Sequence, residues 1–259
     1  MSRGFRVTIA GLYLFILAPL LVVVVVSFNW EPATVFPPPR WSVRWYAHVF
    51  SVDLFVRSTL TSAWLAVAAT ALSTPLGLAA SLAIARGRFP GREAVQAFLL
   101  APLVVPGVVV GIALLASFAA VGLRDAPLRL LASHVLITLP YSVRTILASL
   151  ARLDPALEEA ATTLGGSPAR TFWYVTLPLI RPGIAAGTIF SFIISFDNVP
   201  VSLFLTDART NTLPLAMMSY LEYNFDPSVA AISAMLIGLS VGASLLLERL
   251  FGLKRVLGM

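Results

Sequence analysis

The sequence contains no cysteine. Disulfides, thiolate nucleophiles and cysteine-based metal sites are therefore excluded. Charge is also scarce, because only 12% of the 259 residues are charged, whereas a soluble domain has about 25%. Apolar residues take their place: 58% of the chain is hydrophobic, and the mean hydropathy is +0.90. This balance is typical of a polytopic membrane protein.

Motifs for catalysis are missing as well. The chain has no G-x-x-x-x-G-K-[ST] sequence, so it carries no phosphate-binding loop of that kind. Paired carboxylates, a Ser/His dyad at matched depth and a His/Asp metal cluster cannot be assembled from it. We therefore expect no catalytic residue, no metal site and no cofactor in this chain.

The formal net charge is +6 and the isoelectric point is about 10.3. In a soluble protein this would raise the possibility of nucleic-acid binding. Here the arginines lie at the ends of apolar segments, where they set membrane topology, so we expect no nucleic-acid partner.

Six apolar stretches are long enough to cross a bilayer core, which takes about 20 residues. An isolated segment in lipid must satisfy its own backbone hydrogen bonds, which favours helices. The first stretch resembles a signal peptide, but the sequence SFNWEP follows it instead of a small-residue cleavage site, which favours an uncleaved helix. The sequence thus predicts an all-α membrane protein with six transmembrane helices, over residues 7–28, 58–84, 94–120, 128–150, 182–205 and 228–250.

The positive charges predict the orientation of these spans. With six spans, both termini share one side of the membrane, and twelve of the 18 Lys and Arg residues lie on that side. Cytoplasmic loops carry the excess of Lys and Arg, so we expect both termini in the cytoplasm.

We expect three parts along the chain. Residues 1–57 form an N-terminal transmembrane helix and an extracytoplasmic segment, residues 58–250 form the core membrane domain with five spans, and residues 251–259 form a cytoplasmic tail. Within the first part, residues 43–55 are predicted to form a short amphipathic helix with Trp45, Tyr46, Val49 and Phe50 on or near one face. This helix either anchors at the membrane interface or contributes to binding.

The segment at 154–178 has the signals of two short helices. Asp154-Pro155 is a helix start, Gly165 is a natural stop, and Ser167-Pro168 starts a second helix. Leu177-Pro178 is expected to end it, and Arg181-Pro182 to open the fifth span. Such a bent, polar, cytoplasmic segment suits a docking surface that fits a partner's groove.

Catalysis does not explain this segment. Glu158 and Glu159 are adjacent, so on a helix they point about 100° apart and cannot work as a paired acid and base.

The spacing resembles a known motif. Glu159-Ala160-Ala161, followed by Gly165, Val175 and Leu177-Pro178, resembles the EAA loop of binding-protein-dependent ABC importer permeases, in which isoleucine is most frequent where this chain has Val175. The resemblance covers nearly the whole chain and is strongest to the second permease subunit of spermidine/putrescine-type importers. Its supporting stretches are RWYAHVF (44–50), RGRFPGR (86–92), LPYSVRTILASLARLD (139–154) and SFDNVPVSLFLT (195–206).

The resemblance implies a type I ABC importer fold in a bacterial cytoplasmic (inner) membrane. It implies four kinds of partner: the lipid bilayer, a second, non-identical permease, an extracytoplasmic substrate-binding protein, and an ABC ATPase dimer that uses ATP and Mg²⁺. The EAA helix would be the coupling helix seated in the ATPase. By family position, the coupling residues are Glu159, Ala160, Ala161, Leu164, Gly165 and Ser167.

A substrate path is predicted at Asp197, Asn198 and Pro200. A carboxylate at that depth in a span costs several kcal/mol unless it faces a polar cavity or a partner. Pro200 removes a backbone donor and frees carbonyl groups for a ligand. The alternative is a packing kink in which Asp197 pairs with an arginine of the partner permease. Trp45 on the outer side belongs to the same predicted set, and Tyr220 and Glu222 are candidates for a gate or a contact with the binding protein.

The solute is less well defined. Asp197 suits a cationic solute such as a polyamine, but polyamine permeases often carry an acid after the proline of the third span, where this chain has Pro106-Gly107. Import of another small organic solute is the alternative. An ion-coupled secondary transporter is disfavoured by the EAA loop.

Overall fold

The computed structural model describes residues 3–207 and 209–251, with side chains over residues 4–207 and 209–242. Helices make up 78% of the described residues, which include no strand, only an isolated bridge between Asn29 and Trp41. The predicted all-α class is therefore confirmed. The expected tail, 251–259, lies outside the described residues except for Phe251.

The helices group into two compact units. One unit contains residues 1–57 and 216–259, and the other contains residues 58–215. Two helices cross the boundary along the chain, α3 (Asp53–Arg86) and α11 (Leu213–Tyr223). The three-part division expected from the sequence stays a prediction.

The first unit is built around α1 (Arg3–Ser27), α2 (Arg44–Ser51) and α12 (Ser228–Phe251). Within this unit α12 contacts both α1 and α2. The loop after α1 returns on itself, because the Trp30 amide donates to the Arg40 carbonyl at 3.0 Å and the Ser42 amide donates to the Phe28 carbonyl at 2.6 Å. This loop places α2 so that the Tyr46 hydroxyl lies 2.6 Å from Ser27 Oγ at the end of α1.

The aromatic residues of α2 differ in burial. Trp45 and Val49 are buried, since positions four apart share a helical face, but Phe50 is 69% exposed. Position 50 is one residue further on, about 100° around the helix. Phe50, predicted on or near this face, is therefore not part of its buried side. The helix ends at Ser51 with an extended Val52, and α3 begins at Asp53.

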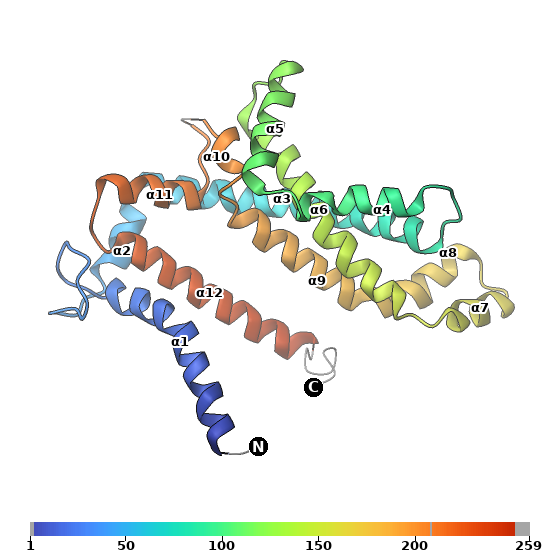
Figure 1. Cartoon of the computed structure of the whole chain (residues 1–259), viewed down its shortest axis with the longest axis horizontal. Coiled ribbons are helices and arrows are strands. Elements are labelled where there is room, and N and C mark those ends of the chain that lie inside the picture. The colour runs from blue at the N-terminus through green and yellow to red at the C-terminus, as the bar shows by residue number, and fades with distance from the viewer. Residues whose placement is uncertain (1–2, 208, 252–259) are drawn as a thin grey trace. The chain divides into compact units, whose positions relative to one another are not determined.

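The second unit packs its long helices through small residues. α6 (Ala126–Ala151) and α9 (Leu177–Phe196) run side by side (Figure 1) and make the most extensive helix contact in the described chain. A β-carbon added at Gly187 of α9 would lie 2.7 Å from Thr145 Oγ1 and 3.0 Å from Ser142 Cα, so the two backbones approach closely. Such close approach is how membrane helices gain packing energy.

Hydroxyl groups add polar contacts to the same interface. Ser191 Oγ lies 3.0 Å from Ser142 Oγ and donates to the Thr138 carbonyl at 3.2 Å. From α3, the Ser81 hydroxyl donates to the Val143 carbonyl of α6 at 3.2 Å. α6 is therefore tied by side chains to both α3 and α9.

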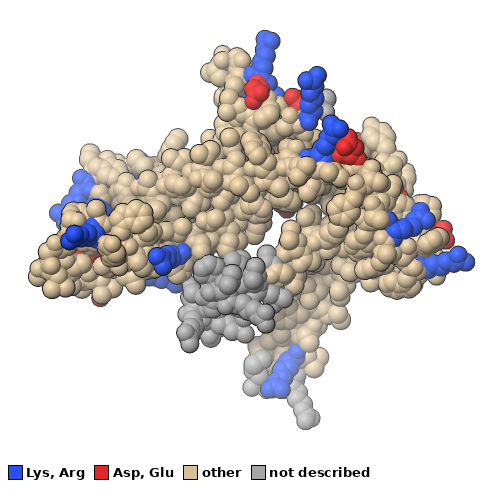
Figure 2. Space-filling view, turned by 180° about the vertical axis from the view of Figure 1, so that it is seen from behind, with Lys and Arg blue, Asp and Glu red and all other residues tan. Residues whose placement is uncertain are grey.

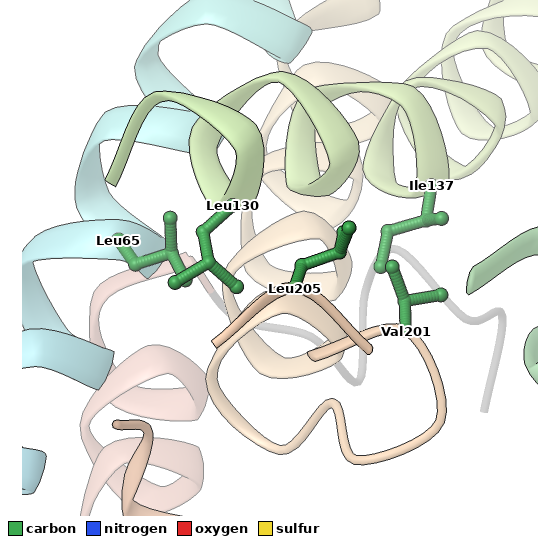
Figure 3. Packing of buried hydrophobic residues seen from close by; sticks show 5 residues of the cluster. All are labelled: Leu65, Leu130, Ile137, Val201 and Leu205. Atoms are coloured by element: carbon green, nitrogen blue, oxygen red, sulfur yellow. The ribbon is translucent and has the colours of Figure 1, made fainter. Parts of the chain in front are cut away.

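Two apolar clusters complete this packing. Figure 3 shows the first, in which Leu65 of α3, Leu130 and Ile137 of α6, and Val201 and Leu205 at α10 (Ser202–Leu205) point toward one another. The second contains Ile146 and Leu150 of α6 with Ile180 of α9, and Leu78, Leu82, Ala85 and Ile184 pack against it.

Among the described residues, four helices are long and apolar enough to cross a membrane: Gly4–Ser27, Asp53–Arg86, Ala126–Ala151 and Pro168–Phe196. A bent pair, Arg92–Leu103 with Gly107–Ala120, raises the number to five if it is one span. Within the described side chains of α12, the apolar helix Ser228–Gly242 is shorter. The count of six spans therefore stays a prediction. Figure 2 shows broad areas of surface without charged side chains, as membrane-spanning helices require.

The stretch 94–120, predicted as one span, is sharply bent in the structure. α4 (Arg92–Leu100) continues into the 3₁₀ turn η1 (Ala101–Leu103), and α5 (Gly107–Ala120) then starts at an angle of 104° to the preceding helix. The bend has a local cause, since Pro106 has no amide to donate and adopts φ −55 and ψ 131 before α5.

Candidate functional site: the coupling segment and the helix break

The segment 154–178, in which coupling to a partner is predicted, begins with α7 (Pro155–Thr163). The Asp154 side chain accepts a hydrogen bond from the Ala156 amide at 3.0 Å, and Pro155 occupies the first turn, as the sequence predicts. Gly165 ends the helix with φ +84. Its amide donates to Thr162 and the next amide, of Gly166, donates to Ala161, both at 2.9 Å. This is the Schellman arrangement, and it fixes the direction of the turn after α7.

A second helix follows, also as predicted. Ser167 Oγ accepts from the Arg170 amide at 3.4 Å, and Pro168 opens α8 (Pro168–Thr171). However, the expected end of this helix at Leu177-Pro178 is wrong. α8 continues through a π-helical turn, η2 (Phe172–Thr176), into α9, so that Pro168–Phe196 is one helix of 29 residues.

The π turn explains why the proline does not stop the helix. The Leu177 amide reaches back to the Phe172 carbonyl, five residues earlier, in place of the usual four. Pro178 therefore falls in the first turn after the change of register, where a missing amide disrupts least.

The predicted coupling residues lie together on α7 and its turn. None of the nine residues of α7 is buried, and Leu164 is 89% exposed. Trp173 and Tyr174, which follow α8, are also exposed. Exposed apolar side chains grouped beside a polar helix are typical of a surface that another protein covers. The coupling role of Glu159, Ala160, Ala161, Leu164, Gly165 and Ser167 stays a prediction.

The sequence interpretation missed Glu158. Its Oε1 accepts a hydrogen bond from the Thr176 hydroxyl at 2.6 Å, and its Oε2 lies 2.9 Å from the Arg86 guanidinium. Glu158 and the half-buried Ala161 are three residues apart and share a helical face, whereas Glu159 is exposed. The two adjacent glutamates differ in exposure only once the chain is folded, so the sequence alone gave no signal for the contacts of Glu158.

The second candidate site is the break after α9. The helix ends at Phe196, and Asp197 is its C-terminal cap. Asn198 Oδ1 accepts from the amides of Val201 at 3.0 Å and Ser202 at 3.4 Å, and so caps α10. The predicted continuation of the fifth span to residue 205 is therefore wrong, because Asn198 and Pro200 start a new, short helix. The substrate-path role of Asp197, Asn198 and Pro200 stays a prediction.

This break lies against the start of α5. A β-carbon added at Gly107 would lie 2.9 Å from Pro200 Cβ. The interruption between η1 and α5 therefore touches the interruption between α9 and α10. The close contact also gives a physical reason for glycine after Pro106, since a side chain at position 107 would collide with Pro200.

A fully buried histidine joins the two ends of the break to α6. His134 Nδ1 lies 2.8 Å from Ser195 Oγ, before the break, and Nε2 lies 3.0 Å from Ser202 Oγ, after it. A neutral imidazole has one donor and one acceptor, so two hydroxyls satisfy it. Among the described residues, no three His, Cys, Asp or Glu side chains are grouped so as to hold a metal ion. Sequence reasoning assigned His134 no structural role.

The remaining predicted residues belong to the first unit. Trp45 is buried, with the Arg44 guanidinium 4.4 Å from its ring centroid. The Tyr220 hydroxyl donates to Asp226 at 2.7 Å. Trp45 and Asp226 line the same cleft of about 630 Å³, together with Arg44, Ala47, His48 and Ser51. Glu222 is exposed. The predicted substrate-path residues are thus divided between the two units. Trp45, Tyr220 and Glu222 belong to the first unit, and Asp197, Asn198 and Pro200 belong to the second.

Asp226 is held as a carboxylate. Partial burial would raise its pKa, but hydrogen bonds from Ser228 and Tyr220 outweigh burial, so the pKa lies below its usual value of 3.8. The cleft that Arg44 and His48 line therefore also carries a negative charge.

Comparison with known proteins identifies the chain. Residues 73–252 match the family described as the inner membrane component of binding-protein-dependent transport systems. The chain belongs to this family. It is a multi-pass membrane permease of the ABC importer type, a transport component rather than an enzyme. The resemblance drawn from the EAA spacing is confirmed.

Individual relatives agree with this assignment. The permease is 31% identical to the putrescine transport system permease protein PotI of Escherichia coli, over 87% of this chain and 83% of that protein. It is 32% identical to the spermidine/putrescine permease PotC of Haemophilus influenzae, over 88% and 89%. It is also 31% identical to the molybdate/tungstate permease WtpB of Pyrococcus abyssi, over 77% and 80%.

Solved structures support the fold. A bacterial ABC transporter involved in the import of the acidic polysaccharide alginate matches 97% of this permease and 99% of its own chain, with a TM-score of 0.72 and 18% identity. An amino acid ABC transporter matches 80% and 98%, with a TM-score of 0.62 and 20% identity. At these identities the likeness concerns the fold alone.

Proposed function

We propose that this permease imports a small cationic solute of the polyamine class, driven by ATP hydrolysis on a partner ATPase dimer. The observation that carries the proposal is the 31% to 32% identity to putrescine and spermidine/putrescine permeases over more than four fifths of each chain. The carboxylate of Asp197, at the meeting of two helix breaks, is a suitable partner for an ammonium group.

The proposed coupling runs through the segment at 154–178. Small Ala160 and Ala161 permit close approach of the ATPase, Gly165 sets the turn, and Glu159 provides a polar anchor. Closure of the ATPase dimer around ATP and Mg²⁺ moves the α7 helices of the two permeases together. The spans then switch between two accesses as rigid bodies.

The proposed assembly contains a second, non-identical permease and an extracytoplasmic substrate-binding protein. Both termini and α7 face the cytoplasm in this arrangement, in line with the excess of Lys and Arg on that side. The cleft at Trp45 and Asp226, with Tyr220 and Glu222 nearby in the chain, then faces outward. It is a candidate surface for contact with the binding protein.

The test is reconstitution. The permease, its second permease, the ATPase and the binding protein are assembled in proteoliposomes, and uptake of labelled putrescine, spermidine and molybdate is measured. We expect uptake of a polyamine that requires hydrolysable ATP. Uptake of molybdate or another small solute in place of polyamines would overturn the solute class. Uptake driven by a proton or sodium gradient alone would overturn the ATP-coupled function.

A further inference from the structure

The α7 helix is weakly held by packing, and this makes its polar contacts important. None of its residues is buried, and its main helical neighbours in the described chain are α8 and η2. Its polar side-chain contacts to other helices in the described part of the chain come from one residue, Glu158. If α7 is the coupling helix, as proposed above, a force applied to it reaches the spans either through Glu158 or through the backbone at its two ends.

Glu158 uses its two oxygens on two different helices. Oε1 accepts from Thr176, which is 3% exposed and is the last residue of η2, directly before α9. Oε2 pairs with Arg86, the last residue of α3. One carboxylate thus joins α7 to the ends of two long helices. We call these three residues the Glu158 clamp.

The clamp lies next to the second apolar cluster. Ala85, adjacent to Arg86, and Ile180, one turn after Thr176, both belong to the packing around Ile146 and Leu150 of α6. Displacement of Arg86 or Thr176 is therefore passed to helices that are tightly packed and move together. At its other end α9 terminates at Asp197, the candidate substrate site.

We infer that Glu158 is a positioning residue that transmits movement of α7 to α3 and α9. Both of its bonds involve a charged group, and such bonds are shorter and stronger than neutral ones. Partial burial, with the Glu158 side chain 21% exposed and Arg86 38% exposed, reduces screening by salt. Without the clamp, a push on α7 is taken up by rotation about Arg152–Asp154 and about the Gly165-Gly166 turn.

The experiment measures coupling directly. Glu158→Gln and Thr176→Val are introduced into the complete reconstituted transporter, and solute imported per ATP hydrolysed is compared with wild type. We expect this ratio to fall about fivefold or more for Glu158→Gln, in the usual range of coupling energies. ATP hydrolysis stays close to wild type, because the carboxylate faces the spans and not the ATPase.

A matched control exists in the same chain. Asp53 and Arg57 form an ion pair of 2.8 Å whose side chains are 73% and 77% exposed. Asp53→Asn removes a pair of the same kind at the surface, and exposed pairs of this kind contribute little. We expect it to leave the import-to-hydrolysis ratio unchanged.

The outcomes separate the possible explanations. The charge-reversed double variant, Glu158→Arg with Arg86→Glu, should recover part of the import-to-hydrolysis ratio that Glu158→Gln loses. If the double variant has no higher ratio than Glu158→Arg alone or Arg86→Glu alone, the clamp is overturned. An unchanged ratio in Glu158→Gln would also overturn it, as would an equal loss of ATP hydrolysis and uptake, which indicates a purely structural role. If wild type itself shows no ATP-dependent uptake, the proposed function fails instead.

Discussion

Gly111 of α5 lies directly against Pro200 in the break after α9. A β-carbon added at Gly111 would lie 3.0 Å from the Pro200 carbonyl oxygen and 2.7 Å from Cδ2 of Phe204. Together with Gly107, which faces the same proline, this contact lets two interrupted spans meet backbone to backbone.

Gly111→Ala should therefore destabilise the permease. The added methyl group has no room, and overpacking of this kind costs about 1–3 kcal/mol. The measurement is the thermal unfolding midpoint of the purified protein in detergent, which we expect to fall. Gly238→Ala is the control, since no atom lies within 4 Å of a β-carbon there. It should be neutral or stabilising, because alanine favours helix over glycine by about 1 kcal/mol. Equal behaviour of the two variants would contradict the close contact.

His134→Leu should also lower the thermal unfolding midpoint of the purified protein. Leucine fills similar space but leaves the buried hydroxyls of Ser195 and Ser202 without their partner, at a cost of about 1–3 kcal/mol for each unsatisfied group. The other histidine, His48, is exposed, so His48→Gln serves as the control and should change stability by less than about 0.5 kcal/mol. Unaltered stability of His134→Leu would show that the two hydrogen bonds are dispensable.

Gly165→Pro should abolish transport while the protein remains inserted in the membrane. Proline fixes φ near −65°, whereas Gly165 has φ +84, so the turn after α7 cannot form. Gly165→Asn is the matched variant, because asparagine accepts the left-handed conformation more readily than other residues, and it should retain uptake. Membrane content by immunoblot and uptake in cells are measured together. Normal uptake by Gly165→Pro would contradict the coupling role of this turn.

Asp197→Asn should reduce uptake of a cationic solute and leave stability nearly unchanged. Asp197 caps the end of α9 through its backbone amide, which donates to the Ile193 carbonyl at 3.1 Å, and asparagine keeps that bond. Loss of the charge removes the attraction for an ammonium group. Uptake rates at several solute concentrations test this, and wild-type rates would favour the alternative in which Asp197 pairs with a partner helix.

The stability of the first unit should depend on pH through Asp226. Because the pKa of Asp226 is lowered in the folded state, its ionised form stabilises the fold above the usual pKa of 3.8. That contribution is lost as pH falls through the lowered pKa. The difference in unfolding midpoint between wild type and Asp226→Asn should therefore be constant above pH 3.8 and shrink below it. A difference that does not depend on pH would rule out this role.

Local signals in the sequence predicted a good part of the molecule. Apolar length identified most of the long helices, and the caps at Asp154, Gly165 and Ser167 located both ends of α7 and the start of α8. These features depend on residues next to one another in the chain, so the sequence is enough to find them. The EAA spacing then indicated the family.

Features that depend on tertiary contact were missed. Pro178 was expected to end a helix, but a π turn before it absorbs the missing amide. The close approach of Gly111 to Pro200 and the bonds of Glu158 to Arg86 and Thr176 join residues far apart in the chain. No pattern in one sequence shows which distant side chain will meet a given carboxylate.

The absence of any buried residue in α7 has an evolutionary consequence. Its outward side chains contribute nothing to the permease's own core, so in the proposed contact with the ATPase they are free to vary with the ATPase surface. Permease and ATPase can therefore acquire compensating substitutions at this contact over time while each keeps its fold. Pairing specificity between related transporters in one cell can arise from this short helix alone.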